Sequence, residues 1–308
     1  MVHTLASLVN AIKSDPRFGS PKAWATFYDI RRYGGLQILL RAIIGGGDFV
    51  FSRAGEPLPV HLSRLRAAGA AAISGTPSHW RRVLMCPQRG LIAPAYIRLS
   101  GEIADQSVLD ALREAYPTAA IGHAYASTEA GVGFAVDDGL AGFPSSIIDA
   151  PVDGPEVRVV EGSLRIRSPG GAATRYLGHG VPALKDELGF IDTGDLVETR
   201  GDRIFFVGRK GGIVNVGGLK VHPEEVEAVV NSHPEVRYSR VRARSNAFTG
   251  ALVVADIVLR DARCAGEPLR RELASFCLAR LERHKAPAVI EFVAEILLTP
   301  SGKVCRAS

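Results

Sequence analysis

The feature that most constrains the fold is an alternation of helical and apolar strand-like segments over the first 150 residues. Helices are predicted at 4–12, 36–44, 62–68 and 105–116 and from Pro77 onward, and strands at 48–52, 70–73, 96–99 and 119–123. Strands that alternate with helices pair in parallel through crossovers, and the helices then cover the faces of the sheet. Residues 1–150 are therefore predicted to form an α/β unit around a mostly parallel sheet.

The pattern changes to strands and turns after residue 150. Alternating runs at 156–160 and 163–167 flank Glu161-Gly162, and Gly201-Asp202 indicates a second hairpin. Residues 151–208 are thus predicted to form an antiparallel, β-barrel-like piece, which with 1–150 makes a core of residues 1–208. Beyond it, strands at 213–216, 236–243, 251–259 and 289–293 and helices at 223–232 and 267–283 predict a small α+β domain over 209–308.

Composition excludes several classes of protein. The chain has 308 residues and a net charge of +5, and its densest basic stretch, 237–244, alternates Arg with other residues. That spacing is typical of a strand with one solvated face and not of a nucleic-acid surface. The four cysteines are scattered, as expected in a reducing compartment. No apolar run approaches the roughly 20 residues of a membrane span, and no secretory signal is visible, so we expect a cytoplasmic location without membrane contact.

One polar motif, Tyr125-Ala126-Ser127-Thr128-Glu129-Ala130-Gly131, directly follows a predicted buried strand. In open α/β sheets, ligands bind at the carboxyl ends of the strands. An aromatic ring can cover an adenine, a hydroxyl can donate to a phosphate, and a carboxylate can hold Mg²⁺. The alternative is a polar turn that leaves a strand.

Three further motifs carry groups suited to a nucleotide. Asp195 lies in the turn 190–196 and could accept from both hydroxyls of a ribose, or simply close a strand. Arg209 could reach the nucleotide, because it precedes Gly211-Gly212, a pair with unusually free φ and ψ. The alternative is that this segment is only a turn in a linker. Lys303 lies on a glycine-containing loop, 298–304, where it could meet a developing anion or belong to a frayed terminus.

Taken together, the types and order of these motifs resemble the superfamily of AMP-forming adenylating enzymes, which includes acyl-CoA synthetases, peptide-synthetase adenylation domains and luciferases. Further stretches that resemble the family are 2–8, 99–103, 162–169 and 216–227. The resemblance covers nearly the whole chain. It implies part of a large N-terminal domain, with α/β sheet layers and the β-barrel piece, followed by a small C-terminal α+β lid domain.

The resemblance also implies roles for individual residues. The nucleotide and thiol contacts would be Gly101, Glu102, Ile103, Tyr125, Ala126, Ser127, Asp195, Arg209, Gly217, Gly218 and Lys220. Within that set Tyr125 would stack on adenine, and Asp195 and Arg209 would hold the ribose. The catalytic residues would be Thr128 at the α-phosphate, Glu129 as the Mg²⁺ ligand, and Lys303 between the carboxylate and the α-phosphate. The hinge of the lid would be Lys210, Gly211 and Gly212.

The sequence departs from the family at the phosphate loop, a Ser-, Thr- and Gly-rich segment ending in Pro-Lys that would precede Val2-His3-Thr4. Gly19-Ser20-Pro21-Lys22 has that ending without the hydroxyls, and Ser74-Gly75-Thr76-Pro77 follows a strand without the Lys. A chain without the loop would lack backbone donors for the β- and γ-phosphates. It would also leave sheet edges exposed, which makes self-association an expectation.

The expected acyl pocket involves Arg32, Tyr33, Gly34 and His123. Many relatives that activate acids have a His where this chain has Arg32. That Arg could favour a substrate with a second anionic group, or it could point to solvent or pair with Asp29. His123 could line the pocket or be a satisfied histidine at the end of a strand.

Two functions remain open on the sequence alone. The first is an AMP-forming acid–thiol ligase that uses ATP and Mg²⁺ to convert a carboxylic acid into an acyl-adenylate, then passes it to CoA or to a carrier-protein thiol. The second is a non-catalytic AMP-binding or partner protein that has lost ATP activation. A further possibility is that the natural chain starts upstream of Met1, which would restore the first.

Overall fold

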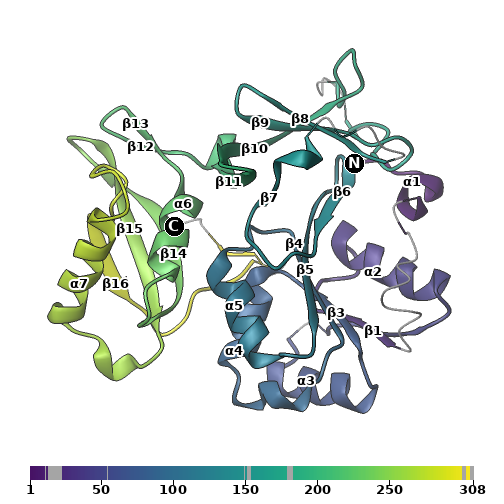
Figure 1. Ribbon diagram of the computed structural model, residues 1–308, viewed down its shortest axis with the longest axis horizontal. Coiled ribbons are helices and arrows are strands. Elements are labelled where there is room, and N and C mark those ends of the chain that lie inside the picture. The colour runs from purple at the N-terminus through teal and green to yellow at the C-terminus, as the bar shows by residue number, and fades with distance from the viewer. Residues whose placement is uncertain are drawn as a thin grey trace.

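The computed structural model describes residues 1–10, 12, 23–53, 55–148, 150, 154–178, 183–299 and 303–305. The stretch Gly19-Ser20-Pro21-Lys22, considered above as a phosphate cradle, lies outside the described residues. Figure 1 shows a core built on two sheets, and beside it a smaller part formed by the last third of the chain.

A six-stranded sheet of order β2-β1-β3-β4-β5-β6 forms the centre of the core. The strands are β1 (Ala23–Thr26), β2 (Asp48–Val50), β3 (Ala72–Gly75), β4 (Tyr96–Ser100), β5 (Ala120–Ser127) and β6 (Gly131–Val136). Neighbours from β2 to β5 pair in parallel, and β6 pairs antiparallel with β5. The mostly parallel sheet predicted from the sequence is confirmed.

Four helices cover this sheet: α2 (Tyr33–Ile44), α3 (Leu58–Ala67), α4 (Pro77–Met85) and α5 (Gln106–Ala115). Successive strand residues point to opposite faces. Ala25 and Ile73 accordingly pack in one apolar cluster with side chains of α3, α4 and α5, whereas Trp24 and Ala72 pack in another with α2. Both faces of the sheet are therefore buried, which explains why its strands are almost wholly apolar.

The second sheet is antiparallel, with the order β7-β11-β10-β9-β8. Its strands are β7 (Phe143–Pro144), β8 (Glu156–Val160), β9 (Ser163–Arg167), β10 (Ile191–Arg200) and β11 (Arg203–Arg209). Glu161 and Gly162 join β8 to β9 with φ values of 52° and 73°. A two-residue turn with both φ values positive matches the twist of a hairpin. The antiparallel piece predicted from the turns is present. Its described strands form a single open sheet, in which β7 and β8 are the edge strands.

The smaller part consists of the sheet β14 (Val236–Asn246), β15 (Gly250–Leu259) and β16 (Val289–Phe292), helices α6 (Pro223–Asn231) and α7 (Glu267–Leu278), and the hairpin β12 (Val214–Val216) and β13 (Leu219–Val221). It has its own apolar cluster, from Val214 to Ile290. We call residues 209–305 the lid and residues 1–208 the core.

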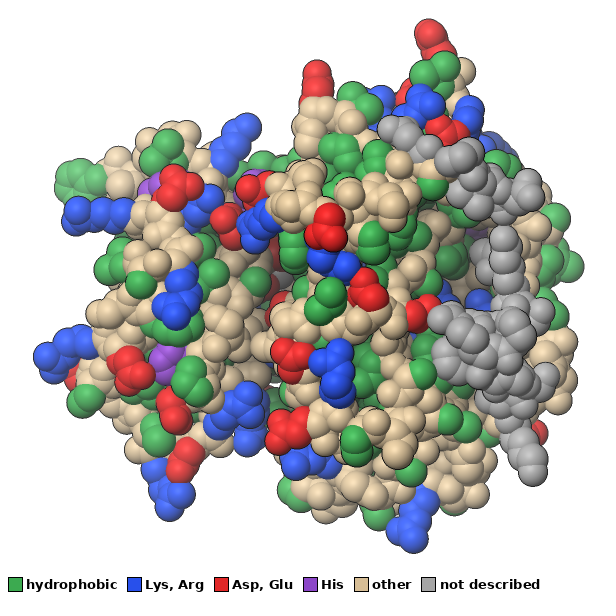
Figure 2. Space-filling model, in the orientation of Figure 1, with side chains coloured by type: hydrophobic (Ala, Val, Ile, Leu, Met, Phe, Trp, Pro, Cys, Tyr) green, Lys and Arg blue, Asp and Glu red, His purple; other side chains and the backbone are tan. Residues whose placement is uncertain are grey.

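Charge is spread over the molecule. Arg240 and Arg242 of β14 both pair with Asp256 of β15, so part of the basic stretch is neutralised within the lid sheet. On the face shown in Figure 2, Lys and Arg side chains alternate with Asp and Glu and form no single stripe. Among the described helices, none combines the length and apolar character that a membrane span requires.

Candidate functional site

The carboxyl ends of β1, β3 and β4 bring polar groups together at one edge of the parallel sheet. The Tyr28 hydroxyl, after β1, donates to the Ser100 carbonyl oxygen at 2.9 Å. Gly101 follows β4 with φ of 85°, a value that favours glycine. A Cβ placed on Gly101 would lie 3.7 Å from Lys303 Cε and 3.8 Å from Thr76 Cγ2. The edge therefore places the lid lysine directly against the turn after β4.

The turn after β3 begins helix α4 and is filled by protein groups. Thr76 caps the helix by accepting from His79 N at 3.1 Å, and Pro77 has no N–H. The remaining donor of the first turn, Ser78 N, is bound by Glu102 Oε2 at 3.0 Å. Anions bind helix N-termini through free N–H groups. Because these donors are already engaged, Ser74-Gly75-Thr76-Pro77 is not a free phosphate cradle.

The Glu102 side chain, which is expected at the adenine edge, accepts two backbone hydrogen bonds. Its Oε2 accepts from Ser78 N, and its Oε1 accepts from Val304 N at 2.8 Å. The side chain thus links the start of α4 to the loop that carries Lys303.

Asp195 lies at the centre of a second group. It accepts from the Tyr125 hydroxyl at 2.5 Å and from Arg209 Nε at 2.6 Å. The Tyr125 ring stacks with Phe134 and Phe206 at centroid distances of 5.6 and 5.3 Å. The Asp195 side chain is only 11% exposed, whereas that of Arg209 is 59% exposed. The carboxylate is therefore fixed, while the guanidinium keeps access to solvent.

Thr128 and Glu129 lie in the turn between β5 and β6. His3 Nε2 donates to the Thr128 carbonyl oxygen at 2.7 Å, and the Glu129 carbonyl oxygen accepts from Ala173 N at 2.9 Å. Both hydrogen bonds are accepted by backbone carbonyl oxygens, so they do not involve the Thr128 hydroxyl or the Glu129 carboxylate. Within the described part of the chain, the Glu129 carboxylate accepts no hydrogen bond.

Lys303 lies among these groups although it belongs to the lid. Its pKa is lowered, first by partial removal from water and then by the positive charge of Arg209. Glu102, Asp195 and Glu129 act in the opposite direction. The charges that act on the Lys303 ammonium therefore include several residues of the core that are predicted to contact the nucleotide.

The predicted hinge forms a short 3₁₀ turn over Lys210–Gly212. Lys210 Nζ bonds Asp192 Oδ2 at 2.8 Å, which ties the hinge to β10. Just before it, Gly208 has φ of 155°, and a Cβ there would lie 2.9 Å from Glu224 Oε2 and 3.0 Å from His222 Nδ1. The lid therefore packs tightly against the core at this glycine. Gly217, Gly218 and Lys220 belong to the β12–β13 hairpin, where Gly217 N donates to Thr249 O.

The residues expected at the acyl pocket have separate surroundings. Arg32 is exposed, and Arg31, not Arg32, makes the hydrogen-bonded ion pair with Asp29. Tyr33 stacks on His3 at 5.2 Å. Gly34 lies against the Tyr28 ring. His123 Nε2 donates to the Leu140 carbonyl oxygen at 2.9 Å, so it is a satisfied histidine within β5.

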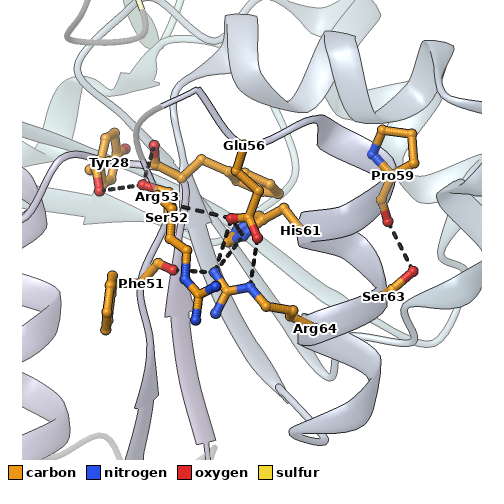
Figure 3. A network of polar contacts seen from close by, with 10 residues as sticks. Tyr28, Phe51, Ser52, Arg53, Glu56, Pro59, His61, Ser63 and Arg64 are labelled. Atoms are coloured by element: carbon orange, nitrogen blue, oxygen red, sulfur yellow. Dashed lines mark hydrogen bonds and ion pairs between the residues drawn. The ribbon is translucent and has the colours of Figure 1, made fainter.

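Sequence reasoning missed a polar network that supports the sheet edge (Figure 3). The Glu56 carboxylate accepts from Arg64 Nε at 2.7 Å and lies 3.1 Å from His61 Nδ1. Nearby, the Ser52 hydroxyl donates to the Tyr28 carbonyl oxygen at 3.1 Å. Glu56 lies in the loop before α3 and Arg64 lies within that helix, so no period of a single element signals the pair.

The family model described as AMP-binding enzyme C-terminal domain matches residues 225–303. A probable 2-succinylbenzoate–CoA ligase from Mycobacterium tuberculosis is 27% identical over 100% of this chain and 79% of its own length. The acyl-coenzyme A synthetase ACSM5 of Rattus norvegicus is 33% identical over 41% of this chain and 22% of its own length. For 4-coumarate–CoA ligase of Pinus taeda, the identity is 28% over 64% of this chain and 39% of the relative.

Solved structures agree on the fold. The anthranilate CoA ligase AuaEII in complex with anthranoyl-AMP has a TM-score of 0.82 at 20% identity, covering 97% of this chain and 61% of that structure. The amide bond synthetase McbA from Marinactinospora thermotolerans has a TM-score of 0.78 at 19% identity, covering 99% and 64%. The chain thus spans about three fifths of the length of these structures, and much less of some relatives. Residues 225–303 thus match the AMP-binding enzyme C-terminal domain, and nearly the whole chain is similar in sequence and in fold to CoA ligases.

Proposed function

We propose that the chain takes part in AMP-forming acid–thiol ligation, in which a carboxylic acid is activated as an acyl-adenylate and passed to CoA or to a carrier-protein thiol. The observation that supports this most directly is the position of Lys303 against Gly101, after β4, where the charges of Glu102, Asp195, Glu129 and Arg209 act on its ammonium group. A cation brought to that edge by a mobile domain suits a reaction that builds negative charge between a carboxylate and a phosphate.

Each residue has a role in this scheme. Tyr125 lies beside the adenine, and Asp195 accepts from the ribose hydroxyls with Arg209 as its partner. Thr128 donates to the α-phosphate. Lys303 neutralises the charge that develops as the acid's oxygen attacks the α-phosphorus and pyrophosphate leaves. The Lys210–Gly212 segment then lets the lid turn, so that the Gly217-Gly218 hairpin meets the thiol.

Glu129 is the proposed Mg²⁺ ligand. Mg²⁺ is usually held by one or two carboxylates together with substrate phosphates, so a single available carboxylate fits a metal that arrives with the nucleotide. No set of three or more metal-binding side chains gathers among the described residues, which is consistent with that arrangement. When bound, the metal would offset the phosphate charge.

The test is nucleotide binding by calorimetry with Mg²⁺, followed by acid-dependent AMP formation in the presence of CoA and a panel of small carboxylic acids. We expect AMP to bind, and Asp195→Ala to abolish binding. Asp195→Asn, which keeps the shape and loses the charge, should weaken it by at least tenfold. Asp110→Asn, an exposed acid on α5, is the matched control. If no nucleotide binds the folded wild-type protein, the proposal fails.

A second function, an AMP-binding or partner protein without ATP activation, has one observation in its favour. The donors at the start of α4 are bound by Thr76 and Glu102, so this helix end offers nothing to the outer phosphates of ATP. If AMP and ATP bind equally tightly and no acid supports AMP formation, this second function replaces the first.

A further inference from the structure

The seam between core and lid contains three polar contacts around the Lys303 loop. The core side is formed by Ser78, Glu102 and Asp105, and the lid side by Tyr238, Val304 and Asn231. None of the lid-side residues is among the predicted nucleotide, acid or thiol contacts. We call this set the seam.

The first contact is the Glu102 carboxylate, which binds Ser78 N of the core and Val304 N of the lid. Val304 directly follows Lys303. The loop carrying both residues is closed by Thr299, whose N and Oγ1 donate to the Lys303 carbonyl oxygen at 2.7 and 3.1 Å. Because the loop is closed on itself, holding the Val304 amide also fixes the backbone of Lys303.

The second contact is centred on Asp105. Its Oδ2 accepts from Arg81 Nη2 at 2.5 Å and from Asn231 Nδ2 of α6 at 3.2 Å. Asn231 Oδ1 accepts in turn from the Ser239 hydroxyl at 2.8 Å. Burial alone would raise the pKa of Asp105, but the charge of Arg81 and hydrogen bonds from Ser107 and Val108 N hold it below the usual value. Asp105 is therefore a charged acceptor for the lid.

The third contact joins two hydroxyls. Ser78 Oγ and Tyr238 Oη lie 2.8 Å apart, and Ser78 and Tyr238 are 2% and 6% exposed. The Arg81 guanidinium lies over the Tyr238 ring, 5.3 Å from its centroid. Met85 and Val304 pack against the same apolar cluster as Tyr238. Each of these hydrogen bonds is replaced by bonds to water when lid and core separate, and the modest net gain of each internal bond disfavours separation.

We propose that the seam is a latch that positions Lys303, with Glu102 as its central positioning residue rather than an adenine contact. This inference rests on the proposed function for its catalytic consequence, but the latch itself is a property of the fold. Breaking the seam should leave Lys303 chemically intact and place it less often at the sheet edge. The rate of acyl-adenylate formation should then fall in proportion to the docked fraction.

The direct test is hydrogen exchange of the Val304 amide in the full chain, read by mass spectrometry. Glu102→Ala removes both acceptors, and we expect exchange at Val304 at least tenfold faster. Glu102→Gln keeps one acceptor oxygen and gives an intermediate rate. Unchanged exchange in both variants, at wild-type melting temperature, would overturn the latch.

Tyr238→Phe separates a latch from a ligand contact, since Tyr238 is not itself among the residues predicted to contact the nucleotide. We expect several-fold faster exchange at Val304, although Glu102 is intact. Tyr116→Phe is the matched control: Tyr116 is equally buried, at 6% exposure, and its hydroxyl donates to Arg89 O within the core. If Tyr116→Phe accelerates Val304 exchange as much as Tyr238→Phe, the effect is general loosening and the proposal fails.

Activity supplies the last readout. With saturating substrates, Glu102→Gln and Tyr238→Phe should lower kcat for acyl-adenylate formation by about tenfold and several-fold, with little change in KM for ATP. If the variants raise only the KM for ATP and leave exchange at Val304 unchanged, Glu102 acts as an adenine contact and the inference is overturned. Should the wild type form no acyl-adenylate, the proposed function fails, while the exchange data still decide the latch.

Discussion

The Tyr125 hydroxyl donates a 2.5 Å hydrogen bond to Oδ2 of Asp195, and Oδ1 of the same carboxylate accepts from Arg209 at 2.6 Å. Burial, reinforced by the Asp195 charge, raises the pKa of Tyr125 far above its usual 10.0. The phenol therefore remains a donor near neutral pH. Asp195 is oriented from both sides before any ligand arrives.

Tyr125→Phe tests this orientation. The ring and its stacking on Phe134 and Phe206 would remain, while Asp195 loses one of its two donors. We expect a loss of about 1 kcal/mol in stability and up to tenfold weaker AMP binding, because the carboxylate is no longer fixed. Chemical denaturation and calorimetry measure the two effects. Phe134→Leu, which changes the stacking and leaves the hydrogen bond, should shift stability more than affinity.

Glu56 predicts a pH dependence of stability. Its hydrogen bonds with Arg64, helped by His61, lower its pKa from 4.5 to about 2. A carboxyl whose pKa is depressed in the folded state contributes stability above pH 4.5, and that contribution is lost as the pH falls toward 2. In Glu56→Gln, this part of the acid dependence should disappear, with a loss of on the order of 1 to 3 kcal/mol near neutrality.

Urea unfolding at about pH 3 and about pH 6 compares wild type with this variant. Glu114→Gln, at an exposed position on α5, is the control and should track the wild type. A Glu56→Gln protein that keeps the full wild-type difference between the two pH values would show that Glu56 is not the group responsible.

Gly208 and Gly211 are a matched pair at the junction of core and lid. Ala at 208 would require a left-handed backbone and place its Cβ 2.9 Å from Glu224 Oε2, whereas a Cβ on Gly211 meets nothing within 4 Å. We expect Gly208→Ala to cost about 1–3 kcal/mol and Gly211→Ala to be close to neutral. Thermal unfolding measures both. Equal losses would mean that the approach of His222 and Glu224 does not constrain position 208.

Lys303 predicts a pH profile for the first half-reaction. Because its pKa is lowered, the charged form is lost at a lower pH than for an ordinary lysine, so acyl-adenylate formation should decline earlier as the solution becomes alkaline. Lys303→Arg should move that decline to higher pH, and Lys303→Gln should reduce the rate by about a hundredfold or more. A profile that is the same in Lys303→Arg and wild type would contradict the role.

Periodicity predicted the local elements well. Helix α5 was predicted from its apolar spacing after Asp105, which does cap it by accepting from Val108 N. Two predicted helices are shorter in the structure: 267–283 ends at Leu278, and 4–12 ends at Val9, where Asn10 forms the C-cap and also binds Pro169 O. Strand β1 was missed because four buried residues, Ala23–Thr26, carry no alternation to distinguish a strand from a helix turn.

The site was only partly predictable. Motif order pointed to Asp195, Arg209 and Lys303, which the fold brings to one edge. The partners of Glu102 could not be foreseen, because Ser78 and Val304 lie 24 and 202 residues away from it in the chain. Such pairings depend on how the lid docks, and no local pattern in the sequence encodes that.

The Glu102 carboxylate, which binds Ser78 N in the first turn of α4, also changes the electrostatics at this end of the helix. A helix start normally attracts phosphate, but here the positive end of α4 is screened by the protein's own Glu102. The Glu102 carboxylate therefore occupies the anion site that the start of α4 would otherwise offer, and the positive charge at this edge comes instead from Lys303, which lies against Gly101 after β4.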